Sequence, residues 1–372
     1  MSNTQKKNVP ELRFPEFEGE WEEKQLWNII KVNSGKDYKH LDKGDIPVYG
    51  TGGYMTSVSE PLSEIDAVGI GRKGTINKPY LLEAPFWTVD TLFYCTPKKE
   101  TDILFILSLF RKINWKVYDE STGVPSLSKQ TINKINRFVP TNKEQQKIGK
   151  FFSKLDRQIE LEEQKLELLQ QQKKGYMQKI FSQELRFKDE NGNDYPDWTN
   201  ERLGEVTTVT MGQSPKSVNY TDNSNDTVLI QGNADIENGL INPRIYTREV
   251  TKLIQKDEII LTVRAPVGKL AMAQINACIG RGVCSIKGDK FLYYFLEWFA
   301  TQNKWIRFSQ GSTFESISGN DIRNIHIKIP VEDERTKIIK LLNSLDVLNS
   351  KTDLKIQNLK QRKQSLLQKI FV

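Results

Sequence analysis

The chain has 372 residues, of which 37% are hydrophobic and 27% charged, a composition typical of a globular protein with room for two cores. Its 54 Lys and Arg residues outnumber its 47 Asp and Glu residues, and the net charge of +7 permits a polyanionic partner without requiring one. No apolar run is long enough to span a membrane, and three cysteines without a CxxC pair exclude a disulfide framework. We therefore expect a cytoplasmic protein with no membrane partner and no metal site.

The predicted elements follow one another as a β-rich body, a long helix, a second β-rich body and a second long helix. Short runs of β-branched and aromatic residues predict the strands, and one longer apolar run in each body predicts a helix. This mixture is typical of an α+β fold. We expect strands near 46–49, 67–70, 86–89, 228–230, 258–263 and 326–329, and body helices over 103–112 and 291–300.

The two halves of the chain are copies of one another. The segment EQQKIGKFFSKLD begins at Glu144, and the similar segment ERTKIIKLLNSLD begins at Glu334, 190 positions later. Both helical segments end in QKIF, and the tetrapeptide ELRF begins at Glu11 and again at Glu184. A common register over such lengths indicates a duplication. The predicted domains are a first body at 1–143, a helix at 144–183, a second body at 184–331 and a helix at 332–372.

Each long helix carries an apolar seam with the alternating spacing of a coiled coil. We predict that the two helices pair antiparallel, which would relate the two bodies by a pseudo-two-fold axis and make the helices a spacer of about 57 Å. Packing of each helix on its own body is the alternative. Polar residues interrupt the seam at Glu162, Lys173, Asn349, Thr352 and Lys363. The apolar seam positions are Ile148, Phe152, Leu155, Ile159, Leu166 and Leu169 in the first helix, and Ile338, Leu342, Leu345, Ile356, Leu359 and Leu366 in the second.

Polar and basic loops recur at matching places in the two bodies. Lys and Arg suit phosphates, Arg also suits guanine, and Gln and Asn suit adenine, so paired loops of this composition favour binding to double-stranded DNA. The candidates in the first body are Ser34, Lys36, Arg72, Lys73, Thr75, Lys78 and Thr122. In the second body they are Gln213, Ser214, Lys216, Gln231, Asn233, Arg264, Lys269, Ser312 and Thr313.

Motifs for catalysis are missing from the sequence. There is no GxxxxGK[ST] phosphate-binding loop and no Pro-Pro dipeptide, which the [DNS]PP[YF] motif of amino-group DNA methyltransferases would need. Pro196-Asp197 has no Glu-x-Lys after it, so a nuclease site of the PD-(D/E)xK type is not predicted. The glycine-rich segment 50–54 is more simply a turn. The sequence therefore favours recognition over chemistry.

The order and duplication of these features resemble the specificity subunit of a type I restriction-modification system. The resemblance rests on features that occur twice. They are the ELRF segments with the Trp and Leu that follow them, the loops with Gly and Arg after a strand, the segments 126–140 and 316–330 that lead into the long helices, and the E[QR]xKI…LD…QKIF helices. It implies two target-recognition domains that read the halves of an interrupted DNA target, with the antiparallel helices as a ruler. It also implies no catalysis and no cofactor in this chain.

The resemblance further implies partner subunits. Two modification subunits would carry S-adenosylmethionine and methylate adenine, and two restriction subunits would use ATP and Mg²⁺. Two other functions stay open at the level of the sequence. A self-contained DNA-modifying enzyme would methylate or cleave DNA when purified alone, and a coiled-coil scaffold or adaptor would not bind DNA in a sequence-dependent way.

Overall fold

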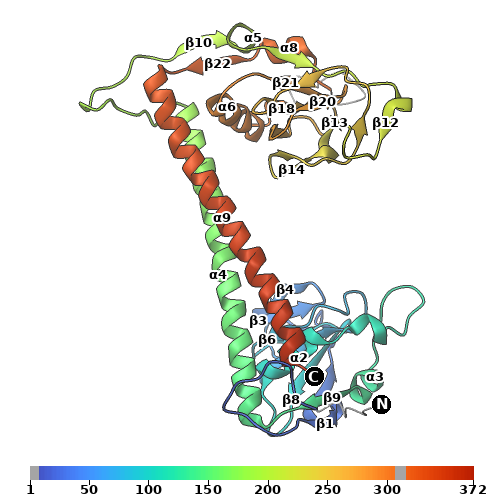
Figure 1. Ribbon diagram of the computed structural model, residues 1–372. Helices are drawn as coiled ribbons and strands as arrows, with labels where there is room; N and C mark the ends of the chain where they lie inside the picture. The colour runs from blue at the N-terminus through green and yellow to red at the C-terminus, as the bar shows by residue number, and fades with distance from the viewer. Residues whose placement is uncertain (1–7, 306–315) are drawn as a thin grey trace. The chain divides into compact units, whose positions relative to one another are not determined.

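A computed structural model describes residues 8–305 and 316–372 of the protein, and it has the predicted α+β architecture (Figure 1). The chain forms two compact units. Unit 1 comprises residues 1–164 and 352–372, and unit 2 comprises residues 165–351. The long helices α4 (Asn142–Phe181) and α9 (Glu332–Ile370) therefore each contribute one part to unit 1 and the other part to unit 2.

Unit 1 contains a four-stranded sheet with the order β2-β8-β5-β6, a three-stranded sheet with the order β4-β3-β7, and the antiparallel pair β1-β9. In the four-stranded sheet each strand is antiparallel to its neighbour. The strands are β1 (Glu22–Gln25), β2 (Ile30–Ser34), β3 (Lys43–Gly50), β4 (Gly53–Val58), β5 (Ala67–Gly71), β6 (Tyr80–Leu82), β7 (Trp87–Thr88), β8 (Leu92–Pro97) and β9 (Asn136–Val139).

Unit 2 contains a six-stranded sheet with the order β11-β21-β18-β19-β15-β14, a five-stranded sheet with the order β12-β16-β13-β20-β17, and the pair β10-β22. Its strands are β10 (Thr199–Arg202), β11 (Val209–Met211), β12 (Tyr220–Thr221), β13 (Thr227–Ile230), β14 (Ile236–Glu237), β15 (Leu240–Ile241), β16 (Tyr246–Thr247), β17 (Leu253–Ile254), β18 (Ile259–Thr262), β19 (Leu270–Met272), β20 (Ala277–Ile279), β21 (Val283–Ile286) and β22 (His326–Ile329).

The duplication seen in the sequence recurs in the topology. The order β2-β8-β5-β6 of unit 1 corresponds to β11-β21-β18-β19 of unit 2, and the pair β1-β9 corresponds to β10-β22. The predicted strands are present, although the run at 86–89 forms only the two-residue strand β7. Residues at matching places in these strands and loops are therefore structurally equivalent in the two bodies.

The helices begin and end close to the predicted positions. α2 has the predicted bounds, and the side chains of Asp102 and Asp289 cap α2 and α6 by accepting a backbone N–H. The helices are α1 (Leu26–Ile29), α2 (Ile103–Lys112), α3 (Lys129–Lys134), α4 (Asn142–Phe181), α5 (Leu203–Val206), α6 (Lys290–Thr301), α8 (Gly319–Arg323) and α9 (Glu332–Ile370), with short 3₁₀ turns η1 (Trp115–Tyr118), η2 (Ser217–Asn219) and η3 (Asn233–Asp235). No helix in the described ranges is long and apolar enough to cross a membrane.

The predicted seam of α4 and α9 is covered in both units. Its members are either buried or half-buried along both helices, as a shared apolar interface requires. In unit 1 Ile148, Phe152 and Ile370 also join the core of the body, and in unit 2 Ile180 and Leu342 do the same. Towards the ends of the helices, residues of α4 and α9 therefore pack in one cluster with each other and with the body.

Ion pairs show that the helix halves run antiparallel within each unit. In unit 1 Asp156 of α4 pairs with Lys363 of α9, and Glu163 pairs with Lys360. In unit 2 Lys173 of α4 pairs with Asp346 of α9 at 2.7 Å. Partners early in one helix thus lie late in the other, as the sequence predicted.

Candidate nucleic-acid interface

In unit 1 three chain segments meet where strands of the four-stranded sheet end. Ser34 at the end of β2 lies opposite the first residues of β8, and so does the end of β5. The Lys36 backbone N–H donates to the Thr88 carbonyl at 2.8 Å, and the Arg72 N–H donates to the Thr91 carbonyl at 2.8 Å. The loop after β2, the loop after β5 and the turn before β8 therefore form one surface, which carries the predicted residues Ser34, Lys36, Arg72 and Lys73.

This surface of unit 1 is hollowed. A cavity of about 390 Å³ is lined by Ser34, Arg72 and Lys73 together with residues that follow the 3₁₀ turn η1. Lys73 forms a β-bridge with Ser126, and the Arg72 guanidinium lies 5.9 Å from the centre of the Phe93 ring. Positive charge and hydroxyl groups thus face the same hollow, an arrangement suited to phosphate and base edges.

The loop that carries Thr122 is held beside this hollow by one carboxylate. Asp119 accepts the backbone N–H groups of Ser121 at 3.0 Å and of Ser126 at 2.9 Å. These donors hold the pKa of Asp119 below its ordinary value. Thr122 is exposed at the tip of the loop, where a ligand could reach its hydroxyl.

Unit 2 forms the equivalent surface from different residues. The Gln213 N–H donates to the Ile279 carbonyl at 2.9 Å, and the Ser214 hydroxyl accepts the Arg281 N–H at 3.1 Å. Gln231 follows β13, and its backbone N–H donates to the Asp235 carboxylate at 2.8 Å. The loop after β11 and the end of β13 therefore flank the turn before β21.

The hollow of unit 2 has a volume of about 620 Å³ and is lined by two arginines, Arg264 and Arg281. Arg264 forms a β-bridge with Ser316, as Lys73 does with Ser126 in unit 1. Arg281 was not among the predicted residues, because it lies in the turn that precedes β21 and not in a loop that follows a strand. The available signal was a charged residue between two glycines, Gly280 and Gly282.

Glycines allow these segments to approach one another closely. A Cβ atom on Gly35 would lie 1.9 Å from the Val89 carbonyl oxygen, and one on Gly212 would lie 2.2 Å from the Gly280 carbonyl oxygen. Any side chain there would push apart the loop and the turn that build the surface. The glycines of the SGK and MGQS segments are thus explained by packing.

The remaining predicted residues differ in how they lie. Lys216 is exposed, and Asn233 is half-buried. On the loop after β5, Thr75 is half-buried and Lys78 is exposed. Ser312 and Thr313 lie outside the described residues.

Lys269 points into the fold. Its ammonium group donates to the carbonyls of Asn233 at 3.2 Å and Ile236 at 2.6 Å, which directs its charge away from solvent. We therefore leave Lys269 out of the proposed contact set.

A buried glutamate in the first turn of each long helix binds the arginine of the ELRF segment. In unit 1 Arg13 of this segment binds Glu144 with two hydrogen bonds, from Nε at 2.8 Å and Nη2 at 2.7 Å, and the Trp21 indole N–H donates to the same carboxylate at 3.3 Å. Glu144 is only 1% exposed. The clamp therefore fixes the N-terminal segment to the start of α4.

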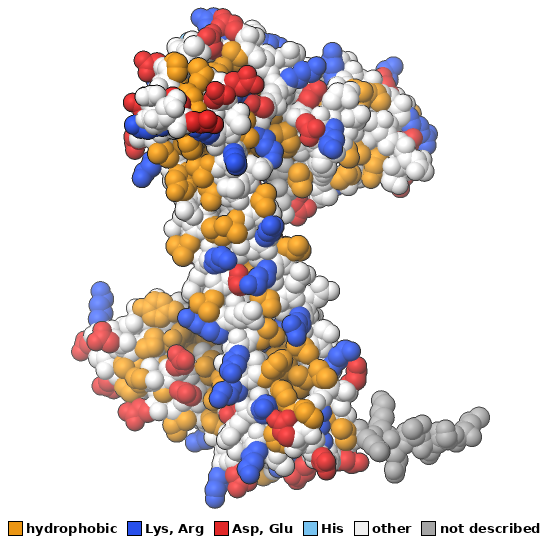
Figure 2. Space-filling view, turned by 60° about the vertical axis from the view of Figure 1, so that its left-hand side comes forward, with side chains coloured by type: hydrophobic (Ala, Val, Ile, Leu, Met, Phe, Trp, Pro, Cys, Tyr) orange, Lys and Arg blue, Asp and Glu red, His pale blue; other side chains and the backbone are white. Residues whose placement is uncertain are grey.

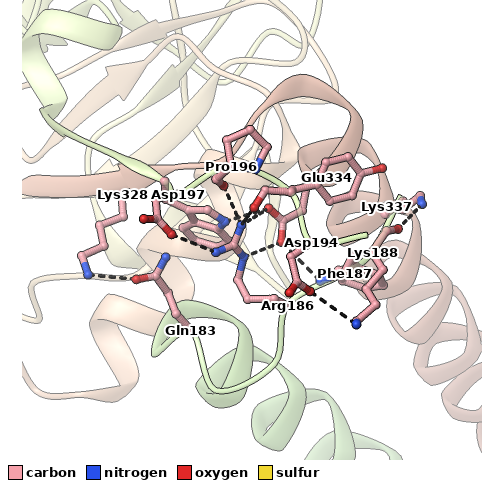
Figure 3. A network of polar contacts seen from close by, with 12 residues as sticks. Gln183, Arg186, Phe187, Lys188, Asp194, Pro196, Asp197, Lys328, Glu334 and Lys337 are labelled. Atoms are coloured by element: carbon pink, nitrogen blue, oxygen red, sulfur yellow. Dashed lines mark hydrogen bonds and ion pairs between the residues drawn. The ribbon is translucent and has the colours of Figure 1, made fainter. Parts of the chain in front are cut away.

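Unit 2 repeats this clamp with Arg186, Trp198 and Glu334. Figure 3 shows Arg186 against Glu334. The Arg186 guanidinium donates to both oxygens of Glu334, at 2.8 and 2.9 Å, and also to the Pro196 carbonyl at 2.7 Å. Hydrogen bonding to Glu334 raises the pKa of Arg186, so the guanidinium stays charged. The ELRF segments and the Trp residues were predicted only as markers of the repeat, and no contact between the arginines and glutamates was predicted.

Neither a cluster of metal-binding side chains nor the surface charge singles out a site among the described residues. Within 8–305 and 316–372 no group of three His, Cys, Asp or Glu side chains is placed to hold a metal ion. On the face drawn in Figure 2, Lys and Arg side chains are interspersed with acidic and hydrophobic ones. Net charge alone therefore does not mark the binding surface, and the matched loops are the stronger guide.

The fold and the two matched surfaces define a class of protein with two equivalent recognition modules on a shared helical pair. A model of the type I restriction modification DNA specificity domain matches residues 18–171 and again residues 195–361. The chain therefore belongs to the family of type I restriction modification DNA specificity domains, and contains the domain twice.

Known relatives agree with this assignment. The putative type I restriction enzyme MjaX specificity subunit of Methanocaldococcus jannaschii is 30% identical over 261 residues, which cover 66% of this chain and 61% of that protein. The MjaVIII specificity subunit of the same organism is 25% identical over 312 residues, which cover 77% of this chain and 71% of the relative. The chain thus matches less than two thirds of the length of the first of these relatives.

Solved structures share the fold. The S subunit of a type I restriction-modification system from M. genitalium superposes with a TM-score of 0.68 at 16% identity, over 98% of this chain and 99% of that one. A chain from a structure of type I R-M complex assembly and conformational transition gives 0.59 at 19% identity, over 94% and 97%. At these identities the likeness concerns the fold.

Proposed function

We propose that the chain is a non-catalytic, DNA-reading specificity subunit of a type I restriction-modification complex, and that each body reads one half of an interrupted target. The observation that carries this proposal is the repetition of one loop surface in both units. In unit 1 Lys73, which follows β5, forms a β-bridge with Ser126. In unit 2 Arg264, which follows β18, forms the equivalent bridge with Ser316. Duplication of a surface with different side chains is what two different half-sites require.

The physical mechanism has two parts. Lys and Arg side chains of the two hollows would neutralise phosphates and give an affinity that falls with salt, and polar side chains would then discriminate bases at about 1–3 kcal/mol for each good pair. Because α4 and α9 each enter both units, binding by one body would raise the effective concentration of the other body at its half-site. The spacing of the half-sites would then be set by the helices.

We further propose that two modification subunits and two restriction subunits dock on this chain, in the cytoplasm, and supply all chemistry. S-adenosylmethionine would be bound by the modification subunits, and ATP and Mg²⁺ by the restriction subunits. Support comes from family membership and from large apolar side chains on the helices that solvent reaches: Leu161 is 48% exposed, Leu168 65% and Leu354 57%. Exposed apolar groups of this size on a helix favour a protein partner.

A methylome tests the proposal. The chain is expressed with its modification subunit in a host free of adenine methylation, and modified adenines are mapped by single-molecule sequencing. The proposal predicts one split motif with a fixed gap, which disappears when this chain is omitted. A stable complex that methylates nothing would favour a scaffold, and methylation or cleavage of DNA by the purified chain alone would contradict the absence of catalysis.

A further inference from the structure

The turn that precedes β8 in unit 1 and the turn that precedes β21 in unit 2 occupy the same place in the fold. Each lies at the centre of its surface. In unit 1 the turn lies between the loops that follow β2 and β5, and in unit 2 between the loops that follow β11 and β18. Three backbone hydrogen bonds recur in pairs and fix the correspondence. They are Val89 to Tyr49 (3.0 Å) and Gly280 to Ile230 (2.7 Å), Arg72 to Thr91 (2.8 Å) and Val263 to Gly282 (2.9 Å), and Gly35 to Leu92 (3.2 Å) and Gly212 to Val283 (3.0 Å).

The central residue of this turn is therefore Asp90 in unit 1 and Arg281 in unit 2. The backbones on both sides of it are tied down by the paired hydrogen bonds, whereas the central side chain is exposed in both units. Within the described parts of the chain neither side chain has an ion-pair partner within 4.0 Å. A fixed backbone that presents an unpaired charge to solvent is a preorganised contact, and the charge is reversed between the two bodies.

Neighbouring groups make this position suitable for reading bases. Arg281 lines the same hollow as Arg264, so two guanidinium groups face one cavity in unit 2. In unit 1 the Arg72 guanidinium donates to the backbone carbonyl of Asp90 at 3.4 Å, which places a cation for phosphate beside an anion. A carboxylate repels phosphate, so on a surface that binds DNA its role would be to accept a hydrogen bond from the amino group of a base.

We infer that the central residue of this turn is a specificity-determining residue in each body: Arg281 reads a guanine in one half-site, and Asp90 reads the amino group of a cytosine in the other. This inference rests on the proposed function and deepens it. Arg donates to the O6 and N7 atoms of guanine with two parallel hydrogen bonds, and a carboxylate accepts from cytosine N4. The two half-sites should therefore differ in base at the equivalent position.

The experiment uses the complex of the full chain with its modification subunit and compares methylomes of the wild type, Arg281→Ala and Asp90→Ala. For Arg281→Ala we expect a guanine of one half-site to become dispensable, with preference for it reduced about 10-fold to 100-fold. For Asp90→Ala a cytosine of the other half-site should relax in the same way. Each variant should leave the opposite half-site unchanged.

Matched controls lie at the far ends of strands that border the turns. Lys287→Ala removes an exposed charge just after β21, whereas Arg281 lies just before it, and Glu83→Ala removes one at the end of the sheet opposite Asp90. Neither control should change the motif. Arg281→Lys keeps the charge but not the two-pronged donor, so it should relax the guanine as the Ala variant does.

Four outcomes decide between the claims. Relaxation at one base in one half-site for each variant supports the inference. A uniform loss of methylation without a change of motif, rescued by Arg281→Lys, would overturn it and leave Arg281 as a phosphate contact. No motif with the wild-type chain would refute the proposed function itself, whereas a wild-type motif that both variants leave intact would overturn the inference alone.

Discussion

Single residues decide how each long helix is attached to its body. Glu334 is fully buried, which an ionised carboxylate tolerates only when charged or polar donors satisfy it. Arg186, Trp198 and the Phe187 N–H provide those donors. The clamp therefore fixes the ELRF segment at the start of α9, with the geometry that Figure 3 shows.

Replacing Arg186 by Ala should destabilise unit 2 by about 3 kcal/mol, because removing one partner of a buried ion pair leaves an uncompensated charge. Trp198 and Phe187 still donate to Glu334 in the variant, so the effect should lie at the lower end of the usual range. Urea unfolding followed by tryptophan fluorescence measures the loss. The control is Lys188→Ala, which removes an exposed pair with Asp194 in the same segment and should cost less than about 1 kcal/mol. Equal losses would contradict the clamp.

At this scale the sequence predicted residue types better than contacts. Ser34, Arg72 and Lys73 were recognisable as binding candidates from composition, and the fold brings them to one hollow. Lys269 had the same composition signal, yet its ammonium satisfies backbone carbonyls. Arg13 and Glu144 are 131 positions apart, and no local pattern could show that they meet.

Among the elements, α4 and α9 carry half-buried charges that pair differently in the two units. In unit 1 Asp156 receives two cations, Arg111 of α2 and Lys363 of α9. In unit 2 the equivalent of Lys363 is Lys173, which receives two anions, Glu297 of α6 and Asp346 of α9. The body helix thus contributes a cation in one unit and an anion in the other, so each body matches its own half of the helical pair.

Replacing Lys173 by Met should destabilise unit 2 by about 2–3 kcal/mol at pH 7, because Glu297 and Asp346 lose the cation between them. Burial raises the pKa of Glu297, and Lys173 opposes this in the wild type. A carboxyl whose pKa is raised on folding is protonated more readily in the folded state, so the variant should regain stability as the pH falls from 7 towards 5.

Urea unfolding of this variant at both pH values measures the change. Lys363→Met in unit 1 is the matched control, because Asp156 keeps Arg111 as a partner. Its deficit should be smaller and should not shrink at pH 5. A Lys173→Met deficit that is the same at both pH values would contradict the role assigned to Glu297.

The seam of the helices was the most predictable element, because a four-and-three spacing of apolar residues leaves few alternatives. The polar interruptions at Lys173 and Lys363 were also recognised. Glu297, which pairs with Lys173, and Arg111, which shares Asp156 with Lys363, were not recognised, since both belong to helices of the bodies. Each end of the helical pair shares a core with one body, and these contacts join residues far apart in the sequence.

For the whole molecule, the proposal makes the helices the ruler between half-sites. Inserting one heptad into α4 after Gln164 and one into α9 after Lys351 keeps the seam in register and adds about 10 Å of helix. The gap in the methylated motif should then lengthen by at most about 3 base pairs, with both half-sites unchanged. A methylome of the insertion variant measures this, and an unchanged gap would contradict the ruler.

The most direct test of the central claim, that each body reads one half-site, is a mobility-shift comparison of two variants in the complex with the modification subunit. One variant carries Arg72→Ala and Lys73→Ala, and the other carries Arg264→Ala. Each is titrated with the native target and with targets in which one half-site is scrambled. The account predicts that each variant loses discrimination at a single half-site, a different one for each variant. Equal losses at both half-sites for both variants would contradict it.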